Sequence, residues 1–195
     1  MNFLAHFFLS HQSSALVVGS YLGDFVKGKQ HQHYEAAVRQ GILLHREIDH
    51  YTDTHPVFRR SKHRLAQQQG HYAGVVVDIF YDHLLATHWD AYSDVALPTF
   101  AQRIYRVLQQ RTPLLPSPAQ RVFGYMQGHD WLTNYVHPEG VRRTLSGMQQ
   151  RARFPNRMGQ AWADLVDSRS AYTQEFQAFF PDVQHHVANF LAAAH

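Results

Sequence analysis

The chain has 195 residues, of which 45% are hydrophobic and 17% are charged, and its formal net charge is +3 at pH 7. This length and composition can supply a buried core, so we expect one folded domain over residues 1–195 and not a disordered chain. The chain contains no cysteine, which excludes disulfides, thiolate metal sites and a cysteine nucleophile.

The N-terminal segment is apolar over residues 3–9 but is interrupted by His6. No basic residue precedes it and no small-residue cleavage site follows it, so we do not interpret it as a signal peptide. No other segment approaches the roughly 20 apolar residues that cross a bilayer. We therefore expect a cytoplasmic protein with no membrane insertion.

Helical periodicity dominates the rest of the chain. Apolar residues recur with a period close to 3.6 over residues 35–54, and Pro56 follows the end of that helix. Residues 57–68 predict a short basic helix ended by Gly70, and residues 72–88 predict a long apolar helix.

The second half predicts shorter helices separated by prolines. We expect helices over 100–111 with Thr99 as N-cap, from Ser117 to about 127, from Pro138 to about Arg153, over 157–178, and, after a break at Pro181, over 183–194. No repeat and no convincing strand pair is present. The predicted fold is therefore an all-α, single-domain helical bundle.

Histidine and aspartate side chains fall into helical register in the first half of the chain. His45 and Asp49 are four residues apart, as are Asp78 and Asp82, so each pair shares one helix face. An ionised carboxylate on an apolar helix must be paired, bound to a metal or protonated. One divalent cation would account for several of these groups, and mixed imidazole and carboxylate donors suit Mn, Fe or Zn better than Ca or Mg.

Ordinary contacts explain the same spacing. A His/Asp pair four residues apart is more often a contact on a helix surface than a metal site. Asp49 could pair with Arg46 or Lys62, and His6 could be a core histidine. The spacing alone therefore leaves both interpretations open, and no H-E-x-x-H, P-loop, G-x-S-x-G or EF-hand pattern decides between them.

Basic residues cluster in two stretches. Such clusters suit an acidic partner or phosphate groups, or they form a solvated helix face. No nucleic-acid-binding motif accompanies them, so we expect no nucleic-acid partner. The two clusters are Arg59, Arg60, Lys62 and Arg64, and Arg142, Arg143, Arg151, Arg153 and Arg157.

Several short segments follow one another in a specific order. They are Met1-Asn2-Phe3-Leu4-Ala5-His6; Gly19 with Gly23-Asp24-Phe25-Val26-Lys27-Gly28; Gly41-Ile42, His45-Arg46, Ile48-Asp49 and Thr52-Asp53; Asp78, Asp82-His83-Leu84 and His88-Trp89; and Gly147-Met148 with Arg151. In this order they resemble the acyl carrier protein phosphodiesterase family over most of the chain.

The resemblance implies a divergent, HD-domain-like metal phosphohydrolase that works with Mn²⁺. The implied reaction converts holo-acyl carrier protein and water into apo-acyl carrier protein and 4′-phosphopantetheine. One feature departs from the pattern that names the HD superfamily, because the adjacent pair here is Asp82-His83 and not His-Asp. Which residues bind the metal is therefore left open by the resemblance.

The candidate site residues follow from the spacing and the resemblance together. His45, Asp49, Asp78 and Asp82 are the predicted core of the metal site, and His6 and Asp24 complete it or act beside it. His83 is predicted as a ligand or as the proton donor to the leaving serine oxygen. The predicted phosphate contacts are Lys27, Arg46 and Arg151.

Three other functions fit the same sequence. One is an HD-type phosphohydrolase that acts on a nucleotide or another small phosphodiester. A second is a helical module that binds acyl carrier protein without hydrolysing it. The third is a structural helical protein whose His/Asp pairs are ordinary ion pairs.

Overall fold

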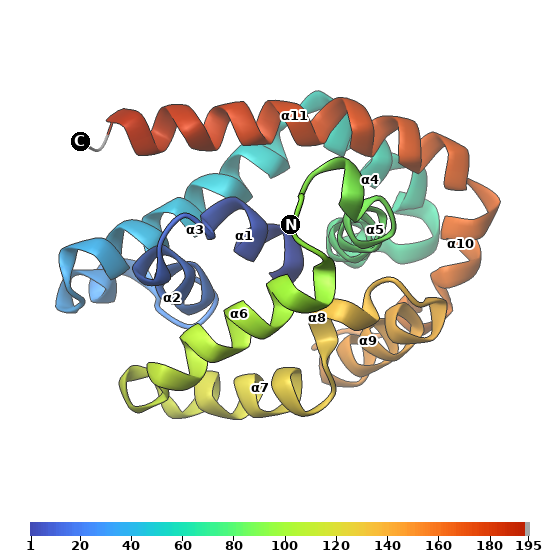
Figure 1. Ribbon diagram of the computed structural model, residues 1–195. Coiled ribbons are helices and arrows are strands. Elements are labelled where there is room, and N and C mark those ends of the chain that lie inside the picture. Colours follow the sequence, from blue (N-terminus) through green and yellow to red (C-terminus); the bar gives the residue numbers. More distant parts are fainter. Residues whose placement is uncertain (194–195) are drawn as a thin grey trace.

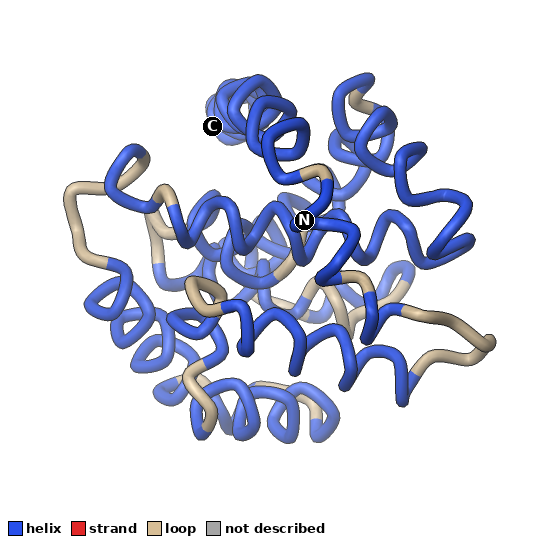
Figure 2. The backbone as a smooth tube through the Cα atoms, turned by 90° about the vertical axis from the view of Figure 1, so that its right-hand side faces the viewer, coloured by secondary structure: helices blue, strands red, loops and turns tan. Residues whose placement is uncertain are grey.

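The computed structural model describes residues 1–193, and within this range it contains helices and connecting turns but no strand (Figures 1 and 2). The all-α prediction is confirmed. The α-helices are α1 (Phe3–Ser10), α2 (Ser14–Leu22), α3 (Ala36–Thr54), α4 (Pro56–Gln69), α5 (Ala73–Thr87), α6 (Leu97–Gln110), α7 (Ser117–Gly128), α8 (Trp131–Asn134), α9 (Pro138–Arg151), α10 (Trp162–Asp167) and α11 (Arg169–Ala193). Short 3₁₀ helices are η1 (Gly28–His33), η2 (Gly70–Tyr72), η3 (Trp89–Ala91), η4 (Thr112–Leu114) and η5 (Met158–Gln160).

The helices of the first half lie close to their predicted bounds. Pro56 stands in the first turn of α4, where its missing N–H costs no hydrogen bond, and the His55 side chain accepts a hydrogen bond from the backbone N–H of Val57. The predicted N-cap Thr99 is wrong. The helix begins at Leu97, because Pro98 occupies its first turn and Ala96 is the capping residue.

The C-terminal region differs most from the prediction. The expected helix over 157–178 is divided into η5, α10 and the start of α11, with Ser168 between the last two. Pro181 does not break α11. Its ring lies on the exposed face, while Phe179, Phe180 and Val183 are buried on the other face and keep both halves packed on the core. The predicted end at Ala194 lies outside the described residues.

Helix α1 lies at the centre of the molecule and is buried along almost its whole length (Figure 1). It packs against α2, α3 and α5, and α11 runs across α3, α4 and α5. The buried apolar residues form one connected cluster that extends from Met1 to Val187. This continuity agrees with the prediction of one domain.

Glycines allow α2 and α3 to cross in close contact. A Cβ on Gly19 would lie 2.1 Å from the carbonyl oxygen of Val38, and one on Gly41 would lie 2.5 Å from that of Leu16. Side chains at either position would force the helices apart. The close crossing of α2 and α3 therefore fixes how the second half of α3 lies against α1 and against the end of α2.

A buried carboxylate joins α4 to α11. Glu175 accepts hydrogen bonds from both terminal nitrogens of Arg64, at 2.6 and 2.7 Å, and from Nε of Arg60 at 3.1 Å. The hydroxyl of Ser61 also donates to Glu175. Burial alone would raise the pKa of Glu175, but the hydrogen bonds from Arg64 and Ser61 outweigh it and hold the pKa below its usual value.

No helix in the described part of the chain is long and apolar enough to cross a membrane.

The Glu175 contact predicts a stability effect. We expect Glu175→Ala to lower the free energy of unfolding by about 3 kcal/mol, since it leaves two guanidinium groups and a buried hydroxyl without their acceptor. Urea denaturation followed by circular dichroism measures this change. The control is Glu139→Ala, which removes an exposed carboxylate 3.7 Å from Arg142 and should change stability little. Equal effects from the two substitutions would contradict the prediction.

Candidate metal centre and adjoining cleft

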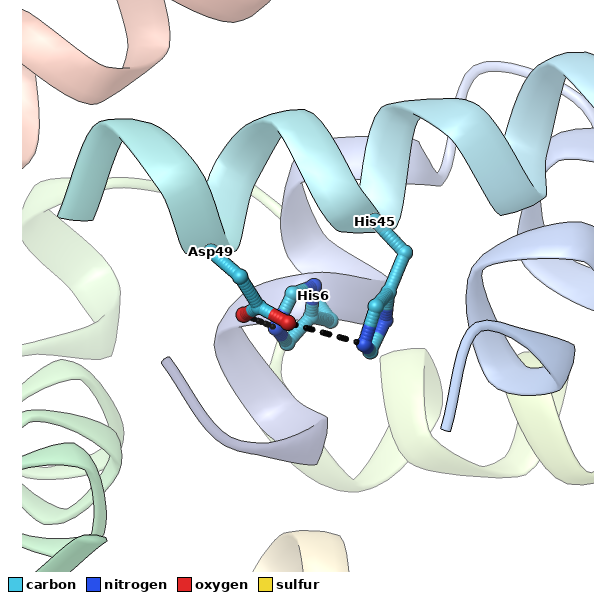
Figure 3. A group of neighbouring side chains, drawn as sticks. All are labelled: His6, His45 and Asp49. Carbon is cyan, nitrogen blue, oxygen red and sulfur yellow. Dashed lines mark hydrogen bonds and ion pairs between the residues drawn. The ribbon is translucent and has the colours of Figure 1, made fainter. Parts of the chain in front are cut away.

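Two imidazoles and one carboxylate converge where α1 meets α3 (Figure 3). Nε2 of His6 lies 3.0 Å from Oδ1 of Asp49, and Nε2 of His45 lies 3.2 Å from Oδ2 of the same carboxylate. The two rings are stacked, with centroids 4.0 Å apart and an interplanar angle of 16°. One donor atom from each of the three residues lies within 4.8 Å of the other two.

Local structure explains this convergence. His45 and Asp49 are one turn apart on α3, so their side chains project from the same face. His6 reaches the pair from α1, which lies beneath α3. Gly23 ends α2 beside the ring of His45, and a Cβ there would lie 2.2 Å from Cγ of that ring. The glycine therefore leaves the space that the imidazole fills.

The environment favours the protonation states that bind metals. Burial, together with the neighbouring imidazole of His45, lowers the pKa of His6 to about 3, although Asp49 partly offsets this effect. Burial would raise the pKa of Asp49, but hydrogen bonds with His45 and His6 hold it well below its usual range. At neutral pH the site therefore holds a neutral His6 imidazole and an ionised carboxylate.

These donors fit a divalent first-row metal ion. Neutral imidazole nitrogen and carboxylate oxygen are ligands that Mn, Fe and Zn accept, and three converging donors leave positions for a substrate or water. The His6 and His45 side chains are 5% and 6% exposed, whereas Asp49 is 46% exposed. The carboxylate therefore opens the otherwise buried group to the solvent. Without an ion, each Nε2–H can instead donate to Asp49.

Asp24 lies next to this group, just beyond the end of α2. Its Oδ1 is 3.7 Å from Nε2 of His45, and its side chain is 48% exposed. Burial of the carboxyl group raises its pKa above the usual value, while His45 and Lys27 act in the opposite direction. Asp24 therefore stays a predicted fourth donor or proton carrier, and its carboxylate lies at the exposed side of the trio.

The structure assigns Asp78 and Asp82 to a different task from the predicted one. Asp82 is fully buried and accepts hydrogen bonds from the backbone N–H groups of Leu4, at 2.8 Å, and Ala5, at 3.3 Å. Oδ1 of Asp78 lies 2.8 Å from the amino nitrogen of Met1. Within the described residues neither aspartate belongs to the converging donor group. Both aspartates lie outside the trio: the oxygens of Asp82 bind the first turn of α1, and Asp78 binds the amino group that precedes this helix.

His83 is also separate from the trio. Its Nδ1 lies 2.7 Å from the carbonyl oxygen of Tyr135, and its ring packs edge-on against Trp162. The residue is 1% exposed and does not line the adjoining cleft. The geometry therefore gives no support to the predicted role of His83 as ligand or proton donor.

The three predicted phosphate contacts lie in different surroundings. Arg46 donates to the carbonyl oxygens of Val26, at 2.9 Å, and Gly28, at 3.0 Å, so it holds the loop after α2 against α3. Lys27 is exposed close to Asp24 but does not line the cleft. Arg151 does line it. Of the three, Arg151 is the residue that the structure places in position to meet a ligand.

A cleft of about 720 Å³ extends from Asp24 between α7, α8 and α9. Its walls are mainly apolar, with Phe3, Phe25 and Trp131 among them, and three arginines also line it. Tyr21 of α2 donates a hydrogen bond to the carbonyl oxygen of Ala119 at 2.6 Å, which fixes the α7 wall. The arginines are Arg121, Arg143 and Arg151.

The sequence pattern did not single out the cleft. The sequence predicts Arg151 as a phosphate contact, but nothing in it separates Arg143 from its neighbour Arg142, which pairs with Glu139. Arg121 is the one arginine of α7 and belongs to neither basic cluster. Trp131 follows Asp130, whose φ is positive, and no sequence motif marks it. Only the packing of α7 and α9 on α8 brings these residues to one surface.

A family model described as acyl carrier protein phosphodiesterase matches residues 1–183. The chain belongs to this family. Among its curated relatives, one from Enterobacter sp. (strain 638) is 31% identical over 93% of this chain and 94% of its own length. Another, from Serratia proteamaculans (strain 568), is 29% identical over 94% and 95%, respectively.

Both relatives carry the name acyl carrier protein phosphodiesterase, as does one from Salmonella agona (strain SL483) that is 30% identical. The resemblance inferred from the short segments is therefore confirmed. No solved structure gives a significant match, so likeness to the HD domain stays a prediction.

The altered assignment of Asp82 predicts a specific pair of outcomes. Asp82→Ala should lower the free energy of unfolding by about 2–3 kcal/mol, because two buried N–H groups lose their acceptor. Asp82→Asn retains an amide oxygen as acceptor and should lose less. Thermal denaturation gives the stabilities and titration calorimetry with Mn²⁺ gives the affinities. A folded Asp82→Asn variant that no longer binds Mn²⁺ would restore Asp82 as a ligand.

The trio makes a second prediction. His45→Ala or Asp49→Asn should weaken Mn²⁺ binding at least about tenfold, since each removes one of three donors. The same calorimetric titration measures this loss. His50→Ala serves as the control, because His50 lies on the exposed side of α3. Unchanged affinity in both site variants would show that the trio is a hydrogen-bonded cluster only.

Proposed function

We propose that this protein hydrolyses holo-acyl carrier protein to apo-acyl carrier protein and 4′-phosphopantetheine. One observation carries the proposal: in a chain of the acyl carrier protein phosphodiesterase family, Asp24 joins a metal-type donor trio to a cleft lined with arginines, because it lies 3.7 Å from His45 and also on the cleft wall. The working metal is Mn²⁺, the substrate is a cytoplasmic carrier protein, and the reaction takes place at the cleft end that contains Asp24.

The reaction breaks one phosphorus–oxygen bond and forms another. The oxygen of water attacks phosphorus, and the bond from phosphorus to the serine oxygen of the carrier protein breaks. The serine oxygen takes up a proton and becomes a hydroxyl, while the phosphate stays on the pantetheine. A bound divalent ion lowers the pKa of water and neutralises charge on a phosphoryl oxygen.

The residues of this chain have distinct parts in this scheme. His6, His45 and Asp49 hold the ion, and the stacked rings fix the direction in which their Nε2 atoms point. Asp24 exchanges a proton with the reacting oxygens, because its carboxylate lies both beside His45 and on the cleft wall. Burial of the two imidazoles excludes water from the inner side of the site.

The arginines of α9 are better suited to the substrate than those of α4. In α4, Arg60 and Arg64 bind Glu175, and Arg59 donates to the carbonyl oxygen of Asp53. Arg143 and Arg151 of α9 face the cleft instead. One guanidinium group can donate two parallel hydrogen bonds to a phosphate. Arg143 and Arg151 therefore supply the phosphate contacts.

Chelation tests the proposal directly. The purified protein is stripped of metal and incubated with holo-acyl carrier protein, and the mass of the carrier protein is followed. We expect loss of the 4′-phosphopantetheine mass only after Mn²⁺ is restored, and we expect Asp49→Asn to reduce the rate at least about 100-fold. Equal rates with and without metal would remove the ion from the scheme.

Nucleotide phosphodiesters and phosphomonoesters are assayed in parallel. If they are hydrolysed and the carrier protein is not, the substrate assignment fails while the metal centre stands. Tight binding of holo-carrier protein without any loss of mass would instead indicate a non-catalytic carrier-protein-binding module.

A further inference from the structure

We infer that the cleft between α7 and α9 is the binding site for the 4′-phosphopantetheine arm itself, and not a surface for the folded part of the carrier protein. This inference rests on the proposed function and deepens it, because it names the part of the substrate that the enzyme recognises. It draws on the shape, the charge and the side chains of the cleft.

The size of the cleft suits a small ligand. The faces of α7 and α9 that line it follow helical spacing, and α8 packs between the two helices. On α9, a Cβ at Gly147 would meet only the guanidinium of Arg151, at 3.5 Å, so the backbone is open to close approach there. The cleft volume of about 720 Å³ lies within the range of small-molecule sites.

The charge of the cleft is uncompensated. Within residues 1–193, Arg121, Arg143 and Arg151 form no ion pair and no hydrogen bond, although nearby arginines do: Arg142 pairs with Glu139, and Arg157 donates to Gln160. Asp24 is the single carboxylate among the described residues that line the wall. Three guanidinium groups without an internal partner supply positive charge for a phosphate.

The remaining wall matches the rest of the arm. The pantetheine part of the arm carries two methyl groups on one carbon, one free hydroxyl group, two amides and a terminal thiol. Phe25, Val122 and Met148 offer apolar surface for the methyl groups and the methylene carbons. Asn134 donates to the carbonyl oxygen of His129 and Thr144 to that of Gly140, so they offer their side-chain oxygens as acceptors and the second N–H of Asn134 as a donor for the amides. A nonpolar wall with a few polar groups is typical of a site that orients one small ligand.

The position of the cleft connects binding to the chemistry. Asp24 belongs both to the cleft wall and to the surroundings of His45. An arm that lies in the cleft with its phosphate toward Asp24 presents the phosphodiester to the donor trio. The serine of the carrier protein then stays at the cleft mouth, so the enzyme recognises the modified protein through the group it removes.

Calorimetric titration with 4′-phosphopantetheine, using the full protein, tests the inference. We expect saturable binding to the wild type. Arg143→Gln should weaken it about tenfold, because a charge-assisted contact is lost. Gly147→Leu, which fills the cleft and favours the helix, should weaken it at least as much. The matched controls are Arg106→Gln, at an exposed position of α6, and Gln150→Leu, at an exposed position of α9. Their affinities should stay within about twofold of that of the wild type.

The same variants are then assayed with holo-acyl carrier protein, and loss of the 4′-phosphopantetheine mass from the carrier protein is followed. The expected result is a rise in KM that parallels the loss of affinity for the free arm. If the wild type does not bind 4′-phosphopantetheine, or if Gly147→Leu binds and turns over substrate like Gln150→Leu, the arm site is overturned while the proposed function can stand. If the arm binds as expected but no carrier protein loses it, the proposed function fails and the binding site stands.

Apo-carrier protein provides the last comparison. If Arg143→Gln and Gly147→Leu weaken its binding and leave the binding of free 4′-phosphopantetheine unchanged, the cleft receives the folded carrier protein, which contradicts the inference.

Discussion

The hydrogen bonds between Asp82 and the first turn of α1 are the contact on which the site depends. Helix α1 has eight residues, too few to be stable alone, and no side chain of its own N-cap satisfies its first N–H groups. The carboxylate of α5 does so from within the core. By fixing the start of α1, it places His6 under α3, where the imidazole meets His45 and Asp49.

Much of this arrangement could be predicted from the sequence, because helical periodicity and i,i+4 spacing are local properties. They correctly gave α3 and the shared face of His45 and Asp49. The task of Asp82 could not be predicted in this way. A buried aspartate in an apolar helix needs a partner, and the sequence does not say whether that partner is an ion or the backbone of a helix 78 residues away.

Tertiary contacts also explain why the predicted helix break at Pro181 is absent from α11. Proline disfavours a helix interior by about 3 kcal/mol, which is why a break at Pro181 was expected. The buried apolar residues on both sides of it, Phe179 and Phe180 before it and Val183 after it, hold α11 on the core and outweigh that cost. Such a balance depends on long-range packing and leaves no signal in local sequence.

The hydrogen bond from Tyr21 to Ala119 ties α7 to α2, the helix whose end carries Asp24. The α7 wall of the cleft and the carboxylate of Asp24 are therefore both attached to α2. A ligand entering such a cleft meets walls already spaced for it, and little of the association free energy is consumed in ordering them. For the proposed arm site, a wall held in place in this way favours ligands of matching width, because bulkier groups are excluded sterically.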